Sequence, residues 1–213
     1  MSSCPIINVV NDVKRSEQTG GVIVQVLKDE LRHKILLESE HLFLQRGYDR
    51  TSLQMIADKV NISKSNLYHY FKNKEELFYE LTDSAADGLK RLILRFRDKR
   101  LDLSIAPEEF RMLLTEEILS LLLAEKYGLL LIMEQANGTR YENLRPVLID
   151  LIASKIRPML ADDDNSLMLA QIMARNLVDG TVHVLKNRVR PSEVRAGLNA
   201  LVEYHTKGIR TLR

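Results

Sequence analysis

Cysteine, glycine and proline are all scarce in this chain. A single cysteine, Cys4, among 213 residues excludes an internal disulfide framework and suits a reducing compartment. The low glycine and proline content, an apolar fraction of 45% and the small number of strand-like segments favour an all-helical fold. No apolar run approaches the roughly 20 residues that a membrane span needs, and no signal sequence is evident, so we expect a cytoplasmic protein.

An excess of charge of one sign is also lacking. The formal net charge is only +2, so any nucleic-acid site must be a local cluster of basic residues. The sequence contains no Gly-rich phosphate loop, nucleophile elbow or paired-carboxylate pattern. Three histidines, His33, His41 and His205, show no metal-ligand spacing with cysteine or a second carboxylate. These absences predict a binding protein without metal or cofactor rather than an enzyme.

Helical periodicity begins after a polar N-terminal segment. Residues 1–28 are predicted to be an arm or linker, bearing Lys14 and Arg15, which either tracks a minor groove or is disordered. A first helix is predicted over residues 29–46, and Gly47 follows it as a stop signal.

Two short helices are predicted next. Thr51 is expected to cap the first of them, with Gln54 reaching back in a capping box. Asn61 suits a left-handed turn, after which Ser63 can cap a third helix. Two helices about three residues apart form the helix-turn-helix pattern, which ordinary helical bundles also show.

The segment after this turn, residues 61–74, reads NISKSNLYHYFKNK and combines lysines with aromatic rings. On a helical wheel at about 100° per residue the polar arc comprises Lys64, Ser65, Tyr68, His69 and Lys72, the opposite arc comprises Leu67, Tyr70 and Phe71, and Asn66 lies on the border. Lysines, hydroxyls and amides on one face of a helix suit the phosphates and base edges of a major groove. The alternative is a solvated basic face with one exposed tyrosine.

Residues 47–57 (GYDRTSLQMIA) and 60–77 (VNISKSNLYHYFKNKEEL) resemble the N-terminal domain of TetR-family transcriptional regulators. The resemblance covers roughly residues 29–77. It depends on the Gly-aromatic pair before Thr-Ser, the Ile-Ala pair, and the pattern Ser-x-x-x-Leu-Tyr-x-x-Phe-x-x-Lys. Asn61 stands where the family often has glycine, and Tyr70 where histidine is frequent.

The resemblance implies a three-helix DNA-binding domain over residues 29–75 and a larger helical-bundle effector-binding and dimerisation domain over residues 76–213. It implies a ligand-released repressor that binds a near-palindromic double-stranded DNA operator as a homodimer formed by the last two helices. The DNA-contacting positions would be Thr51 and Lys74 on phosphates, Ser63, Tyr68 and His69 on the backbone, and Lys64, Ser65 and Asn66 facing bases.

Longer helices are expected beyond residue 74, near residues 74–101, 107 onward, 144–160, 166–186 and 191–212, around an apolar stretch at 119–133. Within the helix at 166–186, Asn176, Asp179 and His183 form a polar stripe flanked by Gln171 and Arg175. That stripe is either a seam between helices or part of a ligand pocket. The other candidates for binding a small-molecule effector are Tyr127, Met133, Glu134 and Asn137.

Two rival interpretations remain at this point. One is a helical small-molecule-binding enzyme in which Glu134, Asp179 and His183 carry out acid–base chemistry, although nothing in the sequence brings them together. The other is a regulator that responds through protein partners and has no small-molecule effector, which a C-terminal domain without a cavity would favour.

Overall fold

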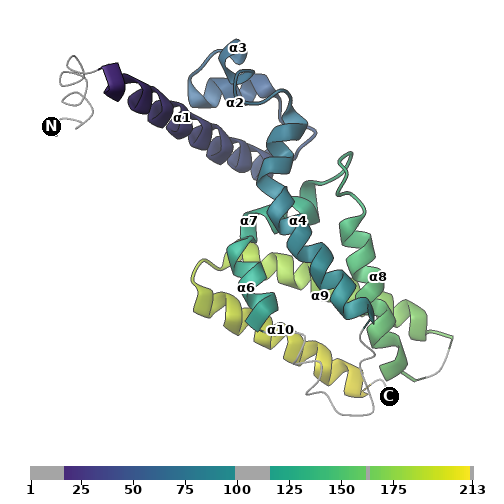
Figure 1. Cartoon of the computed structure of the whole chain (residues 1–213). Helices are drawn as coiled ribbons and strands as arrows, with labels where there is room; N and C mark the ends of the chain where they lie inside the picture. The colour runs from purple at the N-terminus through teal and green to yellow at the C-terminus, as the bar shows by residue number, and fades with distance from the viewer. Residues whose placement is uncertain (1–16, 99–115, 162–163, 212–213) are drawn as a thin grey trace.

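A computed structural model describes residues 17–98, 116–161 and 164–211, and the regular structure within those ranges is entirely helical (Figure 1). The elements are α1 (Glu17–Arg46), α2 (Leu53–Val60), α3 (Lys64–Leu67), α4 (Lys74–Asp98), α6 (Glu116–Ala124), α7 (Lys126–Gln135), α8 (Leu144–Ile156), the 3₁₀ turn η4 (Arg157–Met159), α9 (Ser166–Asn187) and α10 (Pro191–Thr211). The predicted all-α fold is confirmed. None of these helices is both long and apolar enough to cross a membrane.

Helix α4 joins two groups of helices. In Figure 1, α2 and α3 lie beside the C-terminal half of α1, and α4 leaves this small unit and runs into the bundle formed by α6 to α10. Within that bundle α4 packs on α7, and α8 and α10 both pack on α9. Because α4 is unbroken from Lys74 to Asp98, a displacement at one end of it is transmitted along a rigid element to the other.

The small N-terminal unit has a core of large apolar side chains. Phe43 from α1 and Phe78 from α4 are fully buried, with ring centroids 5.6 Å apart in an edge-to-face arrangement. Ile56 from α2 and Leu67 from α3 are buried to the same extent. Each helix therefore presents its apolar stripe to a common centre, as the periodicity of the sequence predicts.

The beginning of α1 differs from the expectation. The helix begins at Glu17, so residues 17–28, which we predicted to belong to the arm, are helical. A formed helix propagates readily, because each added residue contributes one backbone hydrogen bond. Gly20 and Gly21 each lower helix stability by about 1 kcal/mol relative to alanine, but the helix still extends through both. Lys14 and Arg15, and the helix expected from Pro107, lie outside the described residues.

The turn between α2 and α3 confirms the interpretation of Asn61. Asn61 has φ 65° and ψ 48°, the left-handed conformation, and the Ile62 N–H donates to the Ala57 carbonyl at 3.0 Å. This six-to-one bond is the Schellman ending of a helix. Gly47, with φ 88°, ends α1 in the same region of φ, as its position in the sequence predicts.

Helices α4 and α7 approach each other at a glycine. A Cβ on Gly128 of α7 would lie 2.8 Å from the Cβ of Ala85 and 2.9 Å from the carbonyl oxygen of Leu81, both on α4. Any larger residue would push the two helices apart. The apolar stretch at 119–133 is divided at Glu125 into α6 and α7, so that α7 can lie along α4.

Candidate nucleic-acid interface

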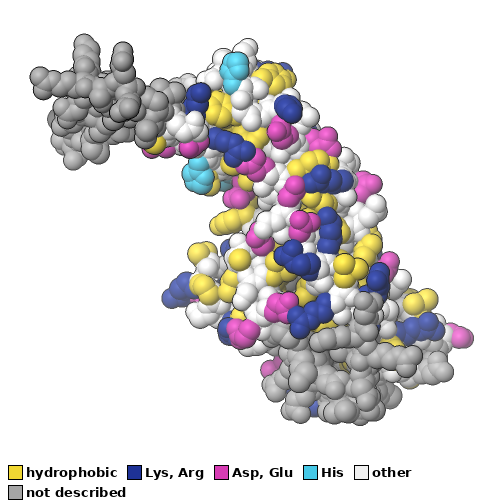
Figure 2. All heavy atoms as spheres, viewed as in Figure 1, with side chains coloured by type: hydrophobic (Ala, Val, Ile, Leu, Met, Phe, Trp, Pro, Cys, Tyr) yellow, Lys and Arg dark blue, Asp and Glu magenta, His cyan; other side chains and the backbone are white. Residues whose placement is uncertain are grey.

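The second short helix exposes a polar face at the end of the molecule opposite the bundle. Lys64, Ser65 and His69 are exposed, and Tyr68 keeps 48% of its surface accessible. The Lys64 ammonium lies 5.9 Å from the centroid of the Tyr68 ring, which places a positive charge beside this exposed ring. Figure 2 shows basic and histidine side chains at this end, whereas basic and acidic side chains alternate along the middle of the molecule.

The opposite face of the same segment fixes its orientation. Leu67 and Phe71 are buried and Tyr70 is half-buried, so the two predicted arcs are confirmed. The helix itself is shorter than expected, because α3 ends at Leu67. The chain continues as tightened turns in which the His69 and Tyr70 N–H groups bond three residues back, to Asn66 and Leu67, and this keeps Tyr68 and His69 on the outer face.

The cap of α2 is Ser52, and the prediction of Thr51 as the cap is wrong. Ser52 Oγ accepts the Met55 N–H at 3.2 Å, whereas Thr51 is 1% exposed and its hydroxyl donates to the Gly47 carbonyl at 2.8 Å. Gln54 donates to Asp58 instead of reaching back to the cap. Since the Thr51 side chain is buried and bonded, Ser52 is the residue that presents a hydroxyl at the start of α2.

Lys74, at the start of α4, is held within the protein. Its ammonium donates to the Tyr48 carbonyl at 2.7 Å and lies 4.1 Å from the centroid of the Tyr48 ring. Burial lowers the pKa of Lys74, and the neighbouring Asp49 carboxylate opposes that shift. Lys74 therefore fastens α4 to the turn after α1 with one of the three N–H donors of its ammonium.

The same end of α4 is capped by the side chains of Asn73 and Glu76. The Asn73 side-chain oxygen accepts the Glu76 N–H at 2.7 Å, and the Glu76 carboxylate accepts the Lys72 N–H at 2.6 Å. These bonds satisfy backbone donors that a helix start leaves unpaired.

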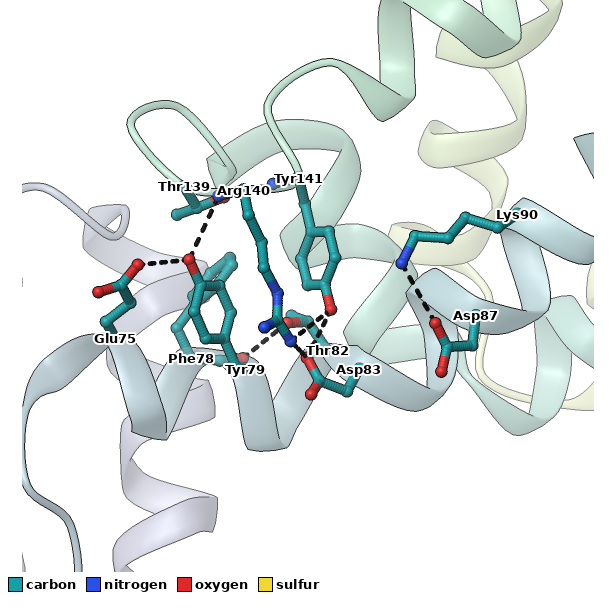
Figure 3. A network of polar contacts seen from close by, with 10 residues as sticks. All are labelled: Glu75, Phe78, Tyr79, Thr82, Asp83, Asp87, Lys90, Thr139, Arg140 and Tyr141. Atoms are coloured by element: carbon teal, nitrogen blue, oxygen red, sulfur yellow. Dashed lines mark hydrogen bonds and ion pairs between the residues drawn. The ribbon is translucent and has the colours of Figure 1, made fainter.

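A polar bridge joins α4 to the segment between α7 and α8 (Figure 3). Arg140 Nη2 donates to Asp83 Oδ1 at 2.6 Å, and the Tyr141 hydroxyl donates to the same oxygen at 2.6 Å. The Arg140 guanidinium carbon lies 3.8 Å from the centroid of the Tyr79 ring, and Tyr79 in turn donates to Glu75, the residue after Lys74. We call these contacts the Arg140 bridge; they connect the bundle to the first turns of α4.

The Arg140 bridge perturbs the acidity of its members. Burial and the hydrogen bond to Asp83 raise the pKa of the Tyr141 hydroxyl to about 12. The hydrogen bond to Asp83 also raises the pKa of the Arg140 guanidinium, so this side chain stays charged. No sequence pattern indicates the bridge, because Asp83 and its partners Arg140 and Tyr141 are almost 60 residues apart.

An apolar cavity of about 170 Å³ lies inside the bundle, lined by side chains of α4, α6, α7, α8, α9 and α10. Of the nine residues predicted to bind an effector, Met133 is the only one that lines it. Tyr127, Asn137, Gln171, Arg175, Asn176, Asp179 and His183 are exposed, and Glu134 pairs with Lys186 at 3.0 Å.

The polar stripe of α9 therefore does not belong to this cavity. Leu177, Val178 and Thr181 occupy the face of α9 that lines the cavity, which directs Asn176 and Asp179 outward. Asp179 forms an ion pair with Arg145 of α8. The interpretation of the stripe as a seam between helices remains a prediction. The sequence analysis missed Lys155, which follows Leu148, Leu151 and Ile152 at helical spacing on the lining face of α8.

Residues 35–81 match the family model described as "Bacterial regulatory proteins, tetR family". The chain is 31% identical over 87 residues to the HTH-type transcriptional activator FasR of Mycolicibacterium smegmatis, a match that covers 39% of this chain and 40% of FasR. It is 34% identical over 68 residues to IcaR of Staphylococcus epidermidis, a negative transcriptional regulator of the biofilm operon icaADBC, covering 32% of this chain and 37% of IcaR. The aligned part thus spans about two fifths of each curated relative.

The solved structure of the ketosteroid transcriptional regulator KstR2 of Mycobacterium tuberculosis superposes with a TM-score of 0.53 at 20% identity. The superposition covers 83% of this chain and 93% of that one. At this level of identity the likeness establishes a shared fold, which includes the helical bundle as well as the N-terminal unit.

Proposed function

From the premise that this chain belongs to the TetR family, we propose that it is a sequence-specific DNA-binding transcriptional regulator, a ligand-released repressor that acts in the cytoplasm. The observation that carries the proposal is the outward polar face of residues 64–69 on a buried apolar anchor. A face of this size and chemistry fits a major groove, with lysines on phosphates and polar groups at base edges.

The individual contacts are those that the family resemblance implies, and the exposure of these side chains supports them. Lys64 and Ser65 face the bases, Asn66 borders them, and Ser63, Tyr68 and His69 contact the phosphate backbone. Ser52 replaces Thr51 as the contact at the start of α2. Lys74 would contact a phosphate through the N–H donors that its bond to Tyr48 does not use.

Two copies of the chain would pair through α9 and α10. These helices expose Met168 at 53%, Ile172 at 46% and Tyr204 at 71%, apolar side chains that a second copy could cover. A two-fold dimer then places two recognition segments about 34–36 Å apart or a multiple of that distance, on a near-palindromic operator. Light scattering measures this directly: Met168→Glu in α9 and Tyr204→Glu in α10 should each convert a dimer into a monomer.

Ligand control would operate through α4. One face of α4, including Leu89, Ile93 and Phe96, lines the cavity, and the other end of the helix begins at Lys74. A ligand that moves this face would shift the Arg140 bridge and the Lys74 contact, and so change the register of Tyr68 on DNA. By thermodynamic linkage, saturating operator must weaken ligand affinity by the same factor as ligand weakens operator affinity.

The cavity favours this mechanism over a regulator without a small-molecule effector. The acid–base alternative has less support: Glu134 pairs with Lys186 and Asp179 with Arg145, so both carboxylates are already engaged in ion pairs. Both observations point to ligand binding in the bundle rather than to catalysis.

The test uses a duplex that the protein itself selects from a random pool, with a scrambled duplex for comparison. Lys64→Ala should cost about 1–3 kcal/mol on the selected duplex and relax base preference. Tyr68→Ala should weaken binding to both duplexes. The control is Arg157→Ala, which removes an exposed cation just after α8. It should leave the affinity for both duplexes unchanged. Unchanged affinity in both test variants would refute the proposed interface.

A further inference from the structure

Arg32, near the middle of α1, is paired with the beginning of α4. Its two terminal guanidinium nitrogens, Nη1 and Nη2, donate to the two carboxylate oxygens of Glu80. Two parallel hydrogen bonds of this kind fix the direction of the contact as well as its distance. The pair therefore holds α4 at one angle to α1, close to the residue at which α4 begins.

The same guanidinium covers Phe71, the last residue of the segment 63–71, which we call the recognition segment. The guanidinium carbon lies 5.0 Å from the centroid of the Phe71 ring, within the range of a cation–π contact. Phe71 is 1% exposed, and its N–H donates to the Leu67 carbonyl at 3.1 Å. A displacement of Phe71 is therefore passed to the turn that carries Tyr68.

Lys34, two residues further along α1, holds the other side of the helix-turn-helix. Its ammonium donates at 3.3 Å to the carbonyl of Val60, the last residue of α2, where a cation is favourable. Helix α1 thus contacts the end of α2 through Lys34 and the end of the recognition segment through Arg32. Both side chains precede residue 35, where the match to the family model begins, so the matched pattern does not include these contacts.

A cation near a DNA-contacting face has one of two roles. A direct contact to a phosphate raises the affinity for every sequence alike. A positioning contact acts on base preference, because hydrogen bonds to base edges need one orientation of the helix, whereas attraction to phosphates tolerates several. The pairing of both terminal nitrogens of Arg32 with Glu80, together with its stacking on Phe71, favours the positioning role.

We propose that Arg32 is a positioning residue that sets the base preference of the recognition segment without itself contacting DNA. By holding Phe71 and Glu80 together, it keeps Lys64 at one angle to the rest of the N-terminal unit. Without this contact the recognition segment populates other orientations, and the apparent affinity for the selected sequence falls with the fraction of molecules in the competent one. The inference rests on the proposed function, because it takes the outer face of the recognition segment as the DNA contact.

Base preference is measured as the ratio of the affinities for the selected and the scrambled duplex, by fluorescence anisotropy at several salt concentrations. Arg32→Gln should lower this ratio at least about threefold, the change to which the lower limits for an exposed ion pair and an exposed cation–π contact add up. The affinity for the scrambled duplex and its salt dependence should stay those of the parent. The matched control is Arg95→Gln, which breaks an ion pair between α4 and Glu117 of α6 and should leave the ratio unchanged.

Glu80→Gln separates positioning from simple charge effects. If only long-range electrostatics mattered, removal of an acidic side chain would strengthen binding to both duplexes alike and leave the ratio unchanged. Because Glu80 holds the guanidinium of Arg32, the substitution should instead lower the ratio. The double variant Arg32→Gln/Glu80→Gln should lower it no further than Arg32→Gln alone, since the two side chains act through one contact.

Three results would overturn the inference. An equal loss on both duplexes, with a salt slope smaller by about 0.9, would make Arg32 a phosphate contact. An unchanged ratio in Arg32→Gln, even with a loss of stability in urea, would leave Arg32 a purely structural side chain. Additive losses in the double variant would show that Arg32 and Glu80 act independently.

Lys64→Ala, titrated in parallel, tests the DNA interface itself. If Lys64→Ala weakens binding to the selected duplex and Arg32→Gln leaves the ratio unchanged, the positioning role alone fails. If neither variant changes binding to either duplex, the proposed interface fails together with the positioning role. Circular dichroism of each variant checks that the helical fold is kept.

Discussion

Replacing Arg140 with alanine removes the guanidinium that joins the bundle to α4. The ion pair with Asp83 is about half exposed on both sides, at 51% and 48%, so it contributes about 0.2–1 kcal/mol. Stacking of the cation on Tyr79 at 3.8 Å adds about 0.5–1 kcal/mol at an exposed site. The bond from Tyr141 to Asp83 survives the substitution. The free energy of unfolding should therefore fall by about 0.7–2 kcal/mol.

Urea denaturation followed by circular dichroism measures this loss. With the same assay in 1 M salt, where the screening length is about 3 Å, the ion-pair part of the difference should shrink. Arg157→Ala, which removes an exposed arginine elsewhere in the bundle, serves as the matched control and should stay within about 0.5 kcal/mol of the parent.

The functional readout is the affinity for the selected duplex. If the Arg140 bridge holds α4 in register with the DNA-contacting face, Arg140→Ala should change this affinity, whereas Arg157→Ala should not. A variant that loses the expected stability yet keeps the full duplex affinity would refute the bridge as the coupling element. An unchanged unfolding free energy would refute the energetic argument itself.

Three further predictions concern the N-terminal unit and the titration of the bridge. Ser52→Ala should lower the free energy of unfolding, measured by urea denaturation, by about 1 kcal/mol because α2 loses its cap. Thr51→Val should lower it by about 1–3 kcal/mol because the Gly47 carbonyl loses its buried donor. Equal stability of Ser52→Ala and the parent would contradict the cap. Asn61→Ala should be about 1 kcal/mol less stable than Asn61→Gly, since φ is 65° there; the reverse order would contradict the left-handed turn. The pKa of Tyr141 is near 10 in the unfolded chain and about 12 in the folded protein. Its contribution to the free energy of unfolding is therefore fully present below pH 10 and is lost as the pH rises through 12. In an ultraviolet titration, Tyr141→Phe should lack the last tyrosine step of the parent.

Some features of the site could be predicted because they depend on neighbours in the chain. The left-handed turn at Asn61 and the outward arc of Lys64 and Tyr68 follow from backbone preference and helical spacing. The choice between Thr51 and Ser52 as the cap could not be made, because either can satisfy the local pattern. Burial against the end of α1 engages the Thr51 hydroxyl and leaves Ser52 as the cap.

The candidate effector site likewise combines features that the local sequence predicts with features that depend on tertiary packing. The sequence indicated polar residues on α9 as ligand contacts, since a stripe of Asn176, Asp179 and His183 stands out among apolar neighbours. Whether this stripe points into the bundle or toward solvent depends on which face of α9 packs inward. The packing of α8 and α10 on α9 decides this, and these helices contribute residues that are distant in the sequence. The same packing places Lys155 among the residues that line the cavity.

The sequence by itself determined the helical class, the position of the helix-turn-helix segment and the two faces of its second helix. These follow from interactions within about four residues, such as hydrogen bonds, caps and apolar periodicity. Only the tertiary structure decided that Lys74 is fastened to Tyr48, that Arg140 binds α4 through Asp83, and that the described residues lining the cavity are almost all apolar. Those contacts join residues from 26 to almost 60 positions apart, and they exist only because the packing of α4, α7 and α8 brings the segments together.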